Sequence, residues 1–313
     1  MTTAIAYTEF GGPEVLHEIP VPEPVAGPGR LTIRVAAAGV NPIDGKLRSG
    51  VRPSAAITEP RRVGGDGAGV VTAVGDGVDG FRVGDSVVFA SAFGSYATDI
   101  AVPAEHVFAR PPQVSAAEGA ALGIPIGTAY QALRSLAVGS GDTVLVHAGS
   151  GAVGQALIQF AVLWGATVVA TSSEGRFDRV RELGAIPVAY GEGLAERVRA
   201  AAPHGVTVAI DAAGTDEALD TSLELVADRQ RIATLVRGRD AAALGIRAFS
   251  GGSPEPLTAQ QQTWRTEAVP VALALMAAGR FVVELGPSFA LADATEAHRL
   301  LEAGVSGKIT LVP

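Results

Sequence analysis

The sequence predicts an α/β protein with two domains, a β-barrel domain followed by a doubly wound parallel sheet. A chain of 313 residues is longer than a single hydrophobic core usually serves. Residues 1–110 consist of short apolar runs broken by glycine and proline, whereas residues 143–249 alternate strand and helix patterns. A glycine-rich turn lies at the first strand–helix junction of this second part.

The N-terminal part has the sequence pattern of an all-β domain of barrel type. Proline-rich residues 19–29 (IPVPEPVAGPG) are expected to form an extended surface connection. Turn-forming residues separate the expected strands. These strands are residues 4–7, 31–38, 69–74, 86–90 and 96–103.

From residue 115 the apolar spacing changes to that of helices and then alternates. Helices are expected at residues 115–122, 128–136, 152–164, 176–183, 194–202 and 217–226. Strands are expected at residues 143–146, 167–171, 186–189, 206–210 and 232–235, with 245–249 as a candidate sixth.

The C-terminal tail is expected to form a helix over residues 267–278, a strand over 281–285 and a helix over 293–302. A last strand, residues 308–312, would return to the first domain. The expected boundaries are therefore 1–122 for the β-barrel domain, 123–262 for the parallel-sheet domain and 263–313 for the returning segment.

Composition excludes several classes of function. The net charge is −8 and no basic block exceeds a pair, so nucleic acid is not an expected partner. No apolar run reaches the ~20 residues that cross a bilayer, and the N-terminus lacks a signal-peptide pattern, so we expect no membrane partner and a cytoplasmic location. Cysteine is absent and the five histidines are scattered, which argues against structural zinc.

The glycine-rich turn has the spacing of a dinucleotide-binding site. Gly149-x-Gly151-x-x-Gly154 follows an apolar strand pattern and precedes a helical one. Such glycines allow a tight turn, close approach of a pyrophosphate, and close helix–strand packing. The alternative is a glycine-rich loop without a ligand, in a chain with 39 glycines. The expected phosphate-binding residues are Gly149, Ser150, Gly151, Ala152, Val153 and Gly154.

Several segments, in this order, carry a resemblance that covers nearly the whole chain. They are NPIDGKLRSG (41–50), GGDGAGVVTAVGDGVDGFRVGDSVV (64–88), GSYATDIAVPAEH (94–106), AALGIPIGTAYQAL (120–133) and GKITLVP (307–313). Together they resemble the medium-chain dehydrogenase/reductases, more narrowly the zinc-free quinone oxidoreductase, or zeta-crystallin-like, branch. The resemblance implies a GroES-like β-barrel catalytic domain, a Rossmann NADP-binding domain, a cleft between them, NADPH as hydride donor, and a homodimer.

Two positions depart from the zinc-dependent members of this family. Asn41 stands where they carry a cysteine ligand, and Gly64-Gly65-Asp66 stands where they carry Gly-His-Glu. Without a zinc Lewis acid, the feasible reaction is hydride delivery to a quinone or another electron-poor, α,β-unsaturated carbonyl. Two alternatives stay open: an enoyl or 2-alkenal reductase, and an NADPH-binding structural or RNA-binding protein without catalysis.

The catalytic candidates are few. The amide of Asn41 could donate to a substrate oxygen or to the nicotinamide ribose, or it could be a turn residue before Pro42. Asp44 and Lys46 follow on the same loop, as catalytic residues or as structural and solvated ones. Thr128 falls where the family's Thr-Ala pair meets the nicotinamide carboxamide, with helix capping as the alternative.

The end of the second strand of the parallel sheet indicates NADPH. Ser172 and Ser173 can donate to a 2′-phosphate and Arg176 can pair with it. Tyr190 matches a tyrosine that the family places beside this phosphate. Glu174 could instead be the acid of an NAD site if the strand ran further.

Two further segments are expected near the cofactor. Ala213 and Gly214 follow the strand expected at residues 206–210, where such a sheet meets its cofactor. Phe249 and Ser250 belong to an FSGG sequence that would be a lid on the nicotinamide or an ordinary glycine turn.

Overall fold

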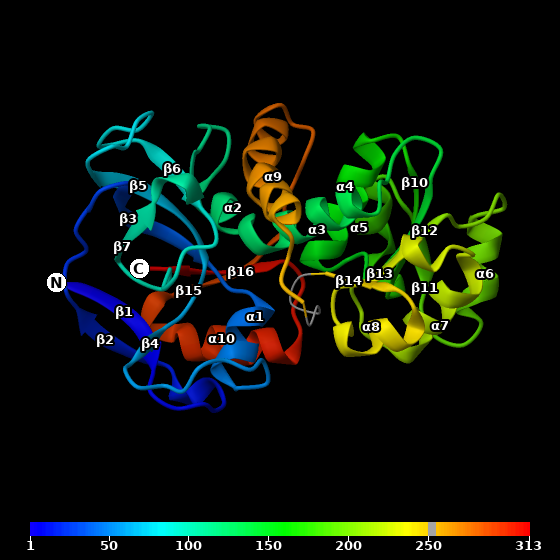
Figure 1. Cartoon of the computed structure of the whole chain (residues 1–313), viewed down its shortest axis with the longest axis horizontal. Helices are drawn as coiled ribbons and strands as arrows, with labels where there is room; N and C mark the ends of the chain where they lie inside the picture. The colour runs from blue at the N-terminus through cyan, green and yellow to red at the C-terminus, as the bar shows by residue number, and fades with distance from the viewer. Residues whose placement is uncertain (250–254) are drawn as a thin grey trace. The chain divides into compact units, whose positions relative to one another are not determined.

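The computed structural model describes residues 1–249 and 255–313 (Figure 1). The chain divides into two compact units. The first unit comprises residues 1–124 and 269–313, and the second comprises residues 125–268. The α/β class predicted from the sequence is confirmed.

The first unit is built on two β-sheets. A three-stranded antiparallel sheet has the order β2 (His17–Val21), β1 (Thr2–Tyr7), β4 (Arg61–Arg62). A seven-stranded sheet runs in the order β15 (Leu285–Ala290), β16 (Lys308–Val312), β3 (Arg30–Gly39), β5 (Asp66–Val74), β6 (Ser86–Phe89), β8 (Val107–Ala109), with β7 (Asp99–Pro103) also paired to β3.

The core of the first unit follows from alternation along β3. Leu31, Ile33 and Val35 are buried, while Arg30 and Arg34 on alternate positions face solvent; Thr32, between Leu31 and Ile33, is buried as well. The short helices of this unit are α1 (Pro42–Arg48), α2 (Ala116–Ala120) and α10 (Ala294–Ala303), with 3-10 turns η1 (Pro13–Val15), η2 (Ala104–His106) and η6 (Leu291–Asp293).

The last strand of the chain is central to the first unit. β16 pairs antiparallel with β3, with Thr310 opposite Gly39, and parallel with β15 on its other side. The first residue of β16, Lys308, is thereby brought into the interior, where it is 5% exposed.

The second unit is a fully parallel six-stranded sheet. Its order is β11 (Ile186–Ala189), β10 (Thr167–Ser172), β9 (Thr143–His147), β12 (Val208–Asp211), β13 (Ile232–Thr234), β14 (Arg247–Ala248). Counted along the chain this order is 3-2-1-4-5-6, the doubly wound order of dinucleotide-binding domains. The predicted parallel sheet is therefore confirmed, including its sixth strand.

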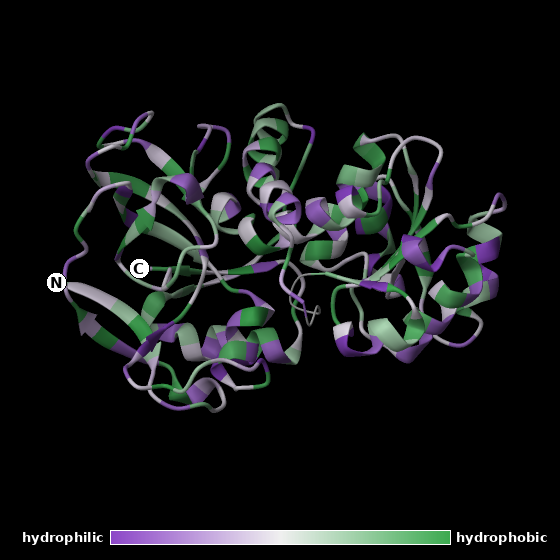
Figure 2. Ribbon diagram, viewed as in Figure 1, coloured by the Kyte–Doolittle hydropathy of each residue, from purple (hydrophilic) through white to green (hydrophobic). Residues whose placement is uncertain are grey.

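Helices connect these strands on both faces of the sheet. Figure 1 shows α4 and α5 on one face and α7 and α8 on the other, and in Figure 2 the helices alternate between hydrophobic and hydrophilic colours. The helices and 3-10 turns are α3 (Gly123–Ser135), α4 (Ala152–Leu163), η3 (Glu174–Arg176), α5 (Phe177–Glu182), α6 (Leu194–Ala201), α7 (Asp216–Leu225), η4 (Arg229–Arg231), α8 (Gly238–Leu244) and α9 (Ala259–Ala277). None of the helices in the described parts of the chain is long and apolar enough to span a membrane.

Three local predictions were wrong. Residues 19–21, the start of the extended connection expected at 19–29, belong instead to β2, because an edge strand tolerates Pro20. The strand expected at 281–285 is β15, Leu285–Ala290, because its position depends on pairing with β16. Asp44 and Lys46 lie in helix α1 rather than on a loop.

The local sequence explains why helix α1 begins at Pro42. Pro42 occupies the first helical position, and the side chain of Asp44 accepts the backbone N–H of Asn41, which is the N-cap. Reading Asn-Pro only as a turn missed this helix start. Helix α8 and strands β4 and β8 were also missed.

Candidate active site

The three glycines of the loop between β9 and α4 have two different structural roles. A Cβ on Gly149 would lie 2.6 Å from the Cβ of Ala170, and one on Gly154 would lie 2.2 Å from the carbonyl oxygen of Ala148. These two glycines therefore serve the packing of the turn and of α4. A Cβ on Gly151 would meet nothing closer than the Ala148 oxygen at 3.5 Å, and Gly151 is exposed.

The N-terminus of α4 is suited to binding an anion. Gly151 is its N-cap and no side chain caps the helix. The first N–H groups of a helix lack intrahelical partners and carry its partial positive charge. Ala152 is exposed and Val153 partly exposed, while the carbonyl of Ser150 accepts the side-chain N–H of Gln155 at 2.9 Å. This loop can therefore hold a pyrophosphate.

Residues at the ends of β10 and β11 lie at the same edge of the parallel sheet as this loop. Ser172 is buried and its hydroxyl donates to the carbonyl of Ser173 at 3.2 Å, whereas Ser173 is exposed. Glu174 begins η3 and lies beyond the end of β10. Arg176 is partly exposed and the Tyr190 side chain is 60% exposed. Ser173, Arg176 and Tyr190 are thus accessible to a ligand, and Ser172 is not.

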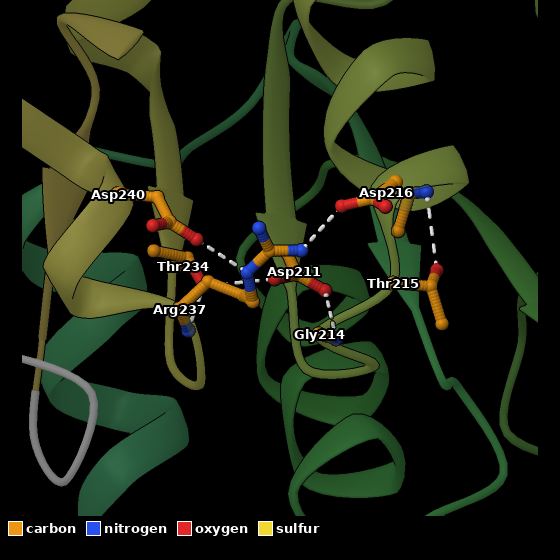
Figure 3. A network of polar contacts seen from close by, with 8 residues as sticks. Asp211, Gly214, Thr215, Asp216, Thr234, Arg237 and Asp240 are labelled. Carbon is orange, nitrogen blue, oxygen red and sulfur yellow. Dashed lines mark hydrogen bonds and ion pairs between the residues drawn. The ribbon is translucent and has the colours of Figure 1, made fainter. Parts of the chain in front are cut away.

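A buried carboxylate organises the loop that carries Ala213 and Gly214 (Figure 3). Asp211, the last residue of β12, is fully buried, and its Oδ1 accepts the N–H groups of Ala213 at 2.9 Å and Gly214 at 2.7 Å. Its Oδ2 accepts the hydroxyl proton of Thr234 at 2.8 Å. This network was not anticipated from the sequence, although Asp211 directly follows the expected strand.

Arg237 extends the network to two helices. Its Nη1 donates to Asp216 of α7 at 2.6 Å and its Nε donates to Asp240 of α8 (Figure 3). Hydrogen bonds first to Asp216 and then to Asp240 hold the pKa of Arg237 above its usual range. The loops after β12 and β13 are therefore tied to the helices that follow them.

His147 is the neighbour of Asp211 on the central strand. The two residues are paired in the β9–β12 register, and His147 Nε2 donates to Ser222, whose own hydroxyl donates to the Ala218 carbonyl. Burial lowers the pKa of His147 to about 4, against the opposing charge of Asp211. His147 is therefore a neutral packing residue at neutral pH.

The remaining cofactor candidates of the second unit are less accessible. Thr128 is 5% exposed and its hydroxyl accepts from Arg265 at 3.3 Å. Phe249 is 2% exposed and packs against the guanidinium of Arg247, 4.8 Å from the ring centroid. Ser250 lies outside the described residues.

In the first unit, Asn41 belongs to a cluster of buried polar side chains. Its Nδ2 donates to Asp66 Oδ2 at 2.9 Å, and its Oδ1 accepts from the ammonium group of Lys308. Asp44 Oδ2 accepts the N–H of Asn41 at 2.8 Å and the hydroxyl proton of Tyr96 at 3.0 Å. The structure thus brings Asn41 and Asp44 together but leaves Lys46 exposed on α1.

Burial changes the acid–base behaviour of this cluster. It raises the pKa of Asp44 to about 7, aided by the charge of Asp66 and opposed by the hydrogen bond from Asn41. It also lowers the pKa of Lys308 to about 8. Both groups therefore titrate close to physiological pH, as groups in active sites often do.

A second set of contacts fixes Tyr96. Arg48 Nη1 donates to His298 Nδ1 at 3.4 Å, so the imidazole proton is on Nε2, which faces the Tyr96 oxygen at 3.3 Å. Burial and the charge of Arg48 lower the pKa of His298 to about 4. The hydroxyl proton of Tyr96 therefore points to Asp44.

Sequence reasoning missed Asp66, Tyr96, His298 and Lys308 as members of this cluster. Asp66, Tyr96 and Lys308 did lie within the quoted motifs GGDGAG, GSYATD and GKITLVP, which were the available signal; His298 lay in none of them. Over residues 1–249 and 255–313, no group of three or more His, Cys, Asp or Glu side chains is arranged to hold a metal ion.

Two family models match the chain. Residues 27–112 match the alcohol dehydrogenase GroES-like domain, and residues 152–249 match the zinc-binding dehydrogenase domain. The human quinone oxidoreductase is 39% identical over 172 residues, which are 54% of this chain and 52% of that protein. The chain thus spans about half the length of the curated relatives it matches.

Solved structures match over the whole length. A mycobacterial quinone oxidoreductase is 33% identical with a TM-score of 0.80, and the match covers 100% of both chains. The quinone oxidoreductase of Escherichia coli, solved in complex with NADPH, is 26% identical with a TM-score of 0.84 over 99% of this chain and 100% of that one. With the GroES-like β domain, the doubly wound sheet and these matches together, the chain belongs to the medium-chain dehydrogenase/reductase family, in its quinone oxidoreductase branch.

Proposed function

We propose that this protein is an NADPH-dependent, zinc-independent oxidoreductase that transfers a hydride to a quinone or another electron-poor conjugated carbonyl. The observation that carries the proposal is the loop before α4, where Gly151 leaves exposed space at the uncapped positive end of a helix. The E. coli quinone oxidoreductase and a mycobacterial relative that is 33% identical were both solved with NADPH.

The choice of NADPH over NADH rests on the residues after β10 and β11. Ser173 and Tyr190 present hydroxyl groups at the surface, and Arg176 supplies a positive charge. These groups suit a 2′-phosphate. Glu174 follows the strand end and does not occupy the last strand position from which an acid accepts the ribose hydroxyl.

The residues at the former zinc positions do not fit that metal. Gly65 has no side chain, and the amide of Asn41 contacts Asp66 and Lys308. Neither position offers the sulfur or imidazole ligand that zinc prefers. No step of the proposed reaction therefore involves zinc.

Bound NADPH would supply the hydride. Our proposed donor to the substrate oxygen is the second N–H of the Asn41 amide, whose contact with the Gly39 carbonyl is long, at 3.4 Å. Asn41 is 1% exposed, so this donation requires the cluster to open to the substrate. Asp44 holds the backbone of Asn41, and Asp66 and Lys308 set the direction of its amide. Lys46 has no role in this proposal because it lies on the exposed face of α1, outside the cluster of hydrogen bonds around Asn41.

The proposal also includes assignments carried by the family resemblance. Residues 1–122 would form the catalytic domain, 123–262 the NADP-binding domain, and 263–313 a segment that returns to the catalytic domain. Homodimeric assembly and a cytoplasmic location belong to the same proposal. Sedimentation equilibrium of the purified protein would test the dimer.

An NADPH-consumption screen tests the function. The acceptors are 1,4-benzoquinone, 9,10-phenanthrenequinone, a series of trans-2-alkenals and cyclohexenone, before and after dialysis against a chelator. We expect turnover with the quinones, unchanged after dialysis. A preference for the alkenals would assign the protein as an enone reductase, and no acceleration by any acceptor would refute the enzymatic proposal.

The cofactor is tested in the same assay with NADH. We expect Arg176→Ala to raise the KM for NADPH without changing that for NADH, because only NADPH has the 2′-phosphate. Equal use of NADH and NADPH by the unaltered protein would contradict the assignment of Ser173, Arg176 and Tyr190.

A further inference from the structure

One guanidinium group holds the loop that carries Tyr190. Arg197 of α6 donates from Nε to the carbonyl of Ala189 at 3.0 Å. It also donates from Nη2 to Gly191 at 2.7 Å and from Nη1 to Glu192 at 2.7 Å. Three of the four carbonyls from Ala189 to Glu192 are therefore fixed by one side chain, through the planar fork of donors that arginine alone provides.

A second helix holds the same loop from its N–H side. Glu217 of α7 accepts the N–H of Gly191 at 3.0 Å. Gly191 has φ +98° and Gly193 has φ +79°, backbone conformations that other residues adopt only with strain. The loop between β11 and α6 is thus held in one conformation by charged side chains on both of the following helices.

The one large side chain on this loop points to the surface. Tyr190 is 60% exposed, although it lies between residues whose backbone is fixed. In the β10–β11 register Ser172 pairs with Ala189. The next residues, Ser173 and Tyr190, therefore follow the ends of two adjacent parallel strands at the same edge of the sheet.

We infer that Arg197 is a positioning residue for cofactor selectivity, which holds Tyr190 so that its hydroxyl donates to the 2′-phosphate of NADPH beside Ser173. This inference rests on the proposed function, because it takes NADPH as the ligand. Arg197 itself donates to backbone carbonyls of the loop, so it acts through Tyr190 rather than on the phosphate.

The physical reason is preorganisation. A loop that is mobile before binding must be ordered when the ligand binds, and ordering the backbone of even one residue costs enough to weaken affinity about tenfold. Arg197 and Glu217 order the loop during folding instead. Binding of the 2′-phosphate then meets a hydroxyl group that is already in place.

Binding measurements with the full-length protein test this inference. Dissociation constants for NADPH, NADH and 2′,5′-ADP are measured by calorimetry for the unaltered protein, Arg197→Met, Tyr190→Phe and the double variant. Tyr190→Phe removes only the hydroxyl, and Arg197→Met keeps most of the aliphatic stem. Arg199→Met is the matched control, because Arg199 lies on the same helix and pairs with Glu224 and Glu196 at the surface.

We expect each single variant to weaken NADPH and 2′,5′-ADP about tenfold and NADH less than twofold. The double variant should be no weaker than the weaker single variant, because both changes remove the same contact. Arg199→Met should bind like the unaltered protein. If Arg197→Met does not fold, Arg197→Lys replaces it. A smaller loss of NADPH affinity is then expected, because the lysine ammonium group can still donate to some of the three carbonyls but cannot reach all of them.

The inference is wrong if Arg197→Met weakens NADPH and NADH equally, if it leaves both unchanged, or if its effect adds fully to that of Tyr190→Phe. The first of these results would mean a general structural role. The unaltered protein reports separately on the proposed function: if it fails to bind NADPH, the function is wrong. If it binds NADPH and the variants behave in one of these three ways, only the role of Arg197 is wrong.

Discussion

The carboxylate of Asp211 accepts the hydroxyl proton of Thr234 at 2.8 Å, which ties together the carboxyl ends of the neighbouring strands β12 and β13. Asp211 also accepts the N–H groups of Ala213 and Gly214, and the Thr234 oxygen accepts that of Arg237 at 2.9 Å. A doubly wound sheet binds its cofactor at this edge. The buried hydrogen bond between Asp211 and Thr234 therefore fixes the conformation of two loops at the proposed NADPH site.

Replacing Thr234 by valine keeps the volume of the side chain and removes its hydroxyl. The change leaves the buried Asp211 Oδ2 without this donor and the partly buried N–H of Arg237 without this acceptor, so we expect a loss of about 1–3 kcal/mol in the free energy of unfolding. NADPH binding should weaken as the two loops relax. Urea unfolding and calorimetric titration measure the two effects.

The control for this change is Thr167→Val, at the exposed start of β10. It should alter the free energy of unfolding by no more than about 0.5 kcal/mol. If Thr234→Val were as mild as this control, the hydrogen bond between Asp211 and Thr234 would not hold the loops.

Gly151 and Gly154 offer a matched pair of alanine substitutions. Gly154→Ala places a methyl group 2.2 Å from the backbone oxygen of Ala148, so α4 must move and the protein should lose about 1–3 kcal/mol of stability. Gly151→Ala meets its nearest atom at 3.5 Å and has φ −76°, so stability should change by less than about 0.5 kcal/mol.

The affinity for NADPH should respond differently to the same two alanine substitutions. A methyl group on Gly151 projects into the space where the pyrophosphate approaches the backbone, so Gly151→Ala should weaken NADPH about tenfold while remaining stable. Thermal unfolding and NADPH fluorescence titration check both variants. Normal NADPH affinity in Gly151→Ala would show that the phosphates do not lie on this loop.

The buried carboxyl group of Asp44 should make stability depend on pH. Its pKa is 3.8 in the unfolded chain and about 7 in the fold, so the folded state binds this proton more tightly. Its contribution is fully present below the unfolded value and is lost as the pH rises through about 7. Asp44→Asn removes this titration and keeps an oxygen that can accept from Asn41 and Tyr96.

We expect the stability of Asp44→Asn relative to the unaltered protein to increase by roughly 2 kcal/mol between pH 5 and pH 7. Urea unfolding at several pH values measures this difference. The other charged or titratable groups of the cluster, Arg48, Asp66, Tyr96, His298 and Lys308, are present in both proteins, so the difference reports the titration of Asp44 together with its coupling to Lys308. A difference that does not vary with pH would mean that Asp44 does not titrate in this range.

Much of the second unit could be predicted from short stretches of sequence. The spacing of Gly149, Gly151 and Gly154 between an apolar strand and an apolar helix indicates its structure locally, because strand, turn and helix are adjacent in the chain. The same holds for β9 and β11 of this unit and for β16 of the first unit, whose bounds were predicted to within one residue. Strand β15 was displaced because its register depends on β16, which follows it by more than fifteen residues.

The sequence by itself determined the fold class, the glycine loop and the family, because each depends on neighbouring residues or on motifs in a fixed order. Only the tertiary structure decided which side chains surround Asn41. Lys308 is 267 positions away from Asn41, and it reaches this residue because β16 pairs with β3. The same is true of the loops after β12 and β13: no local pattern indicates that the carboxylate of Asp211 meets Thr234, since that contact exists only when two parallel strands, separated by a helix, lie side by side.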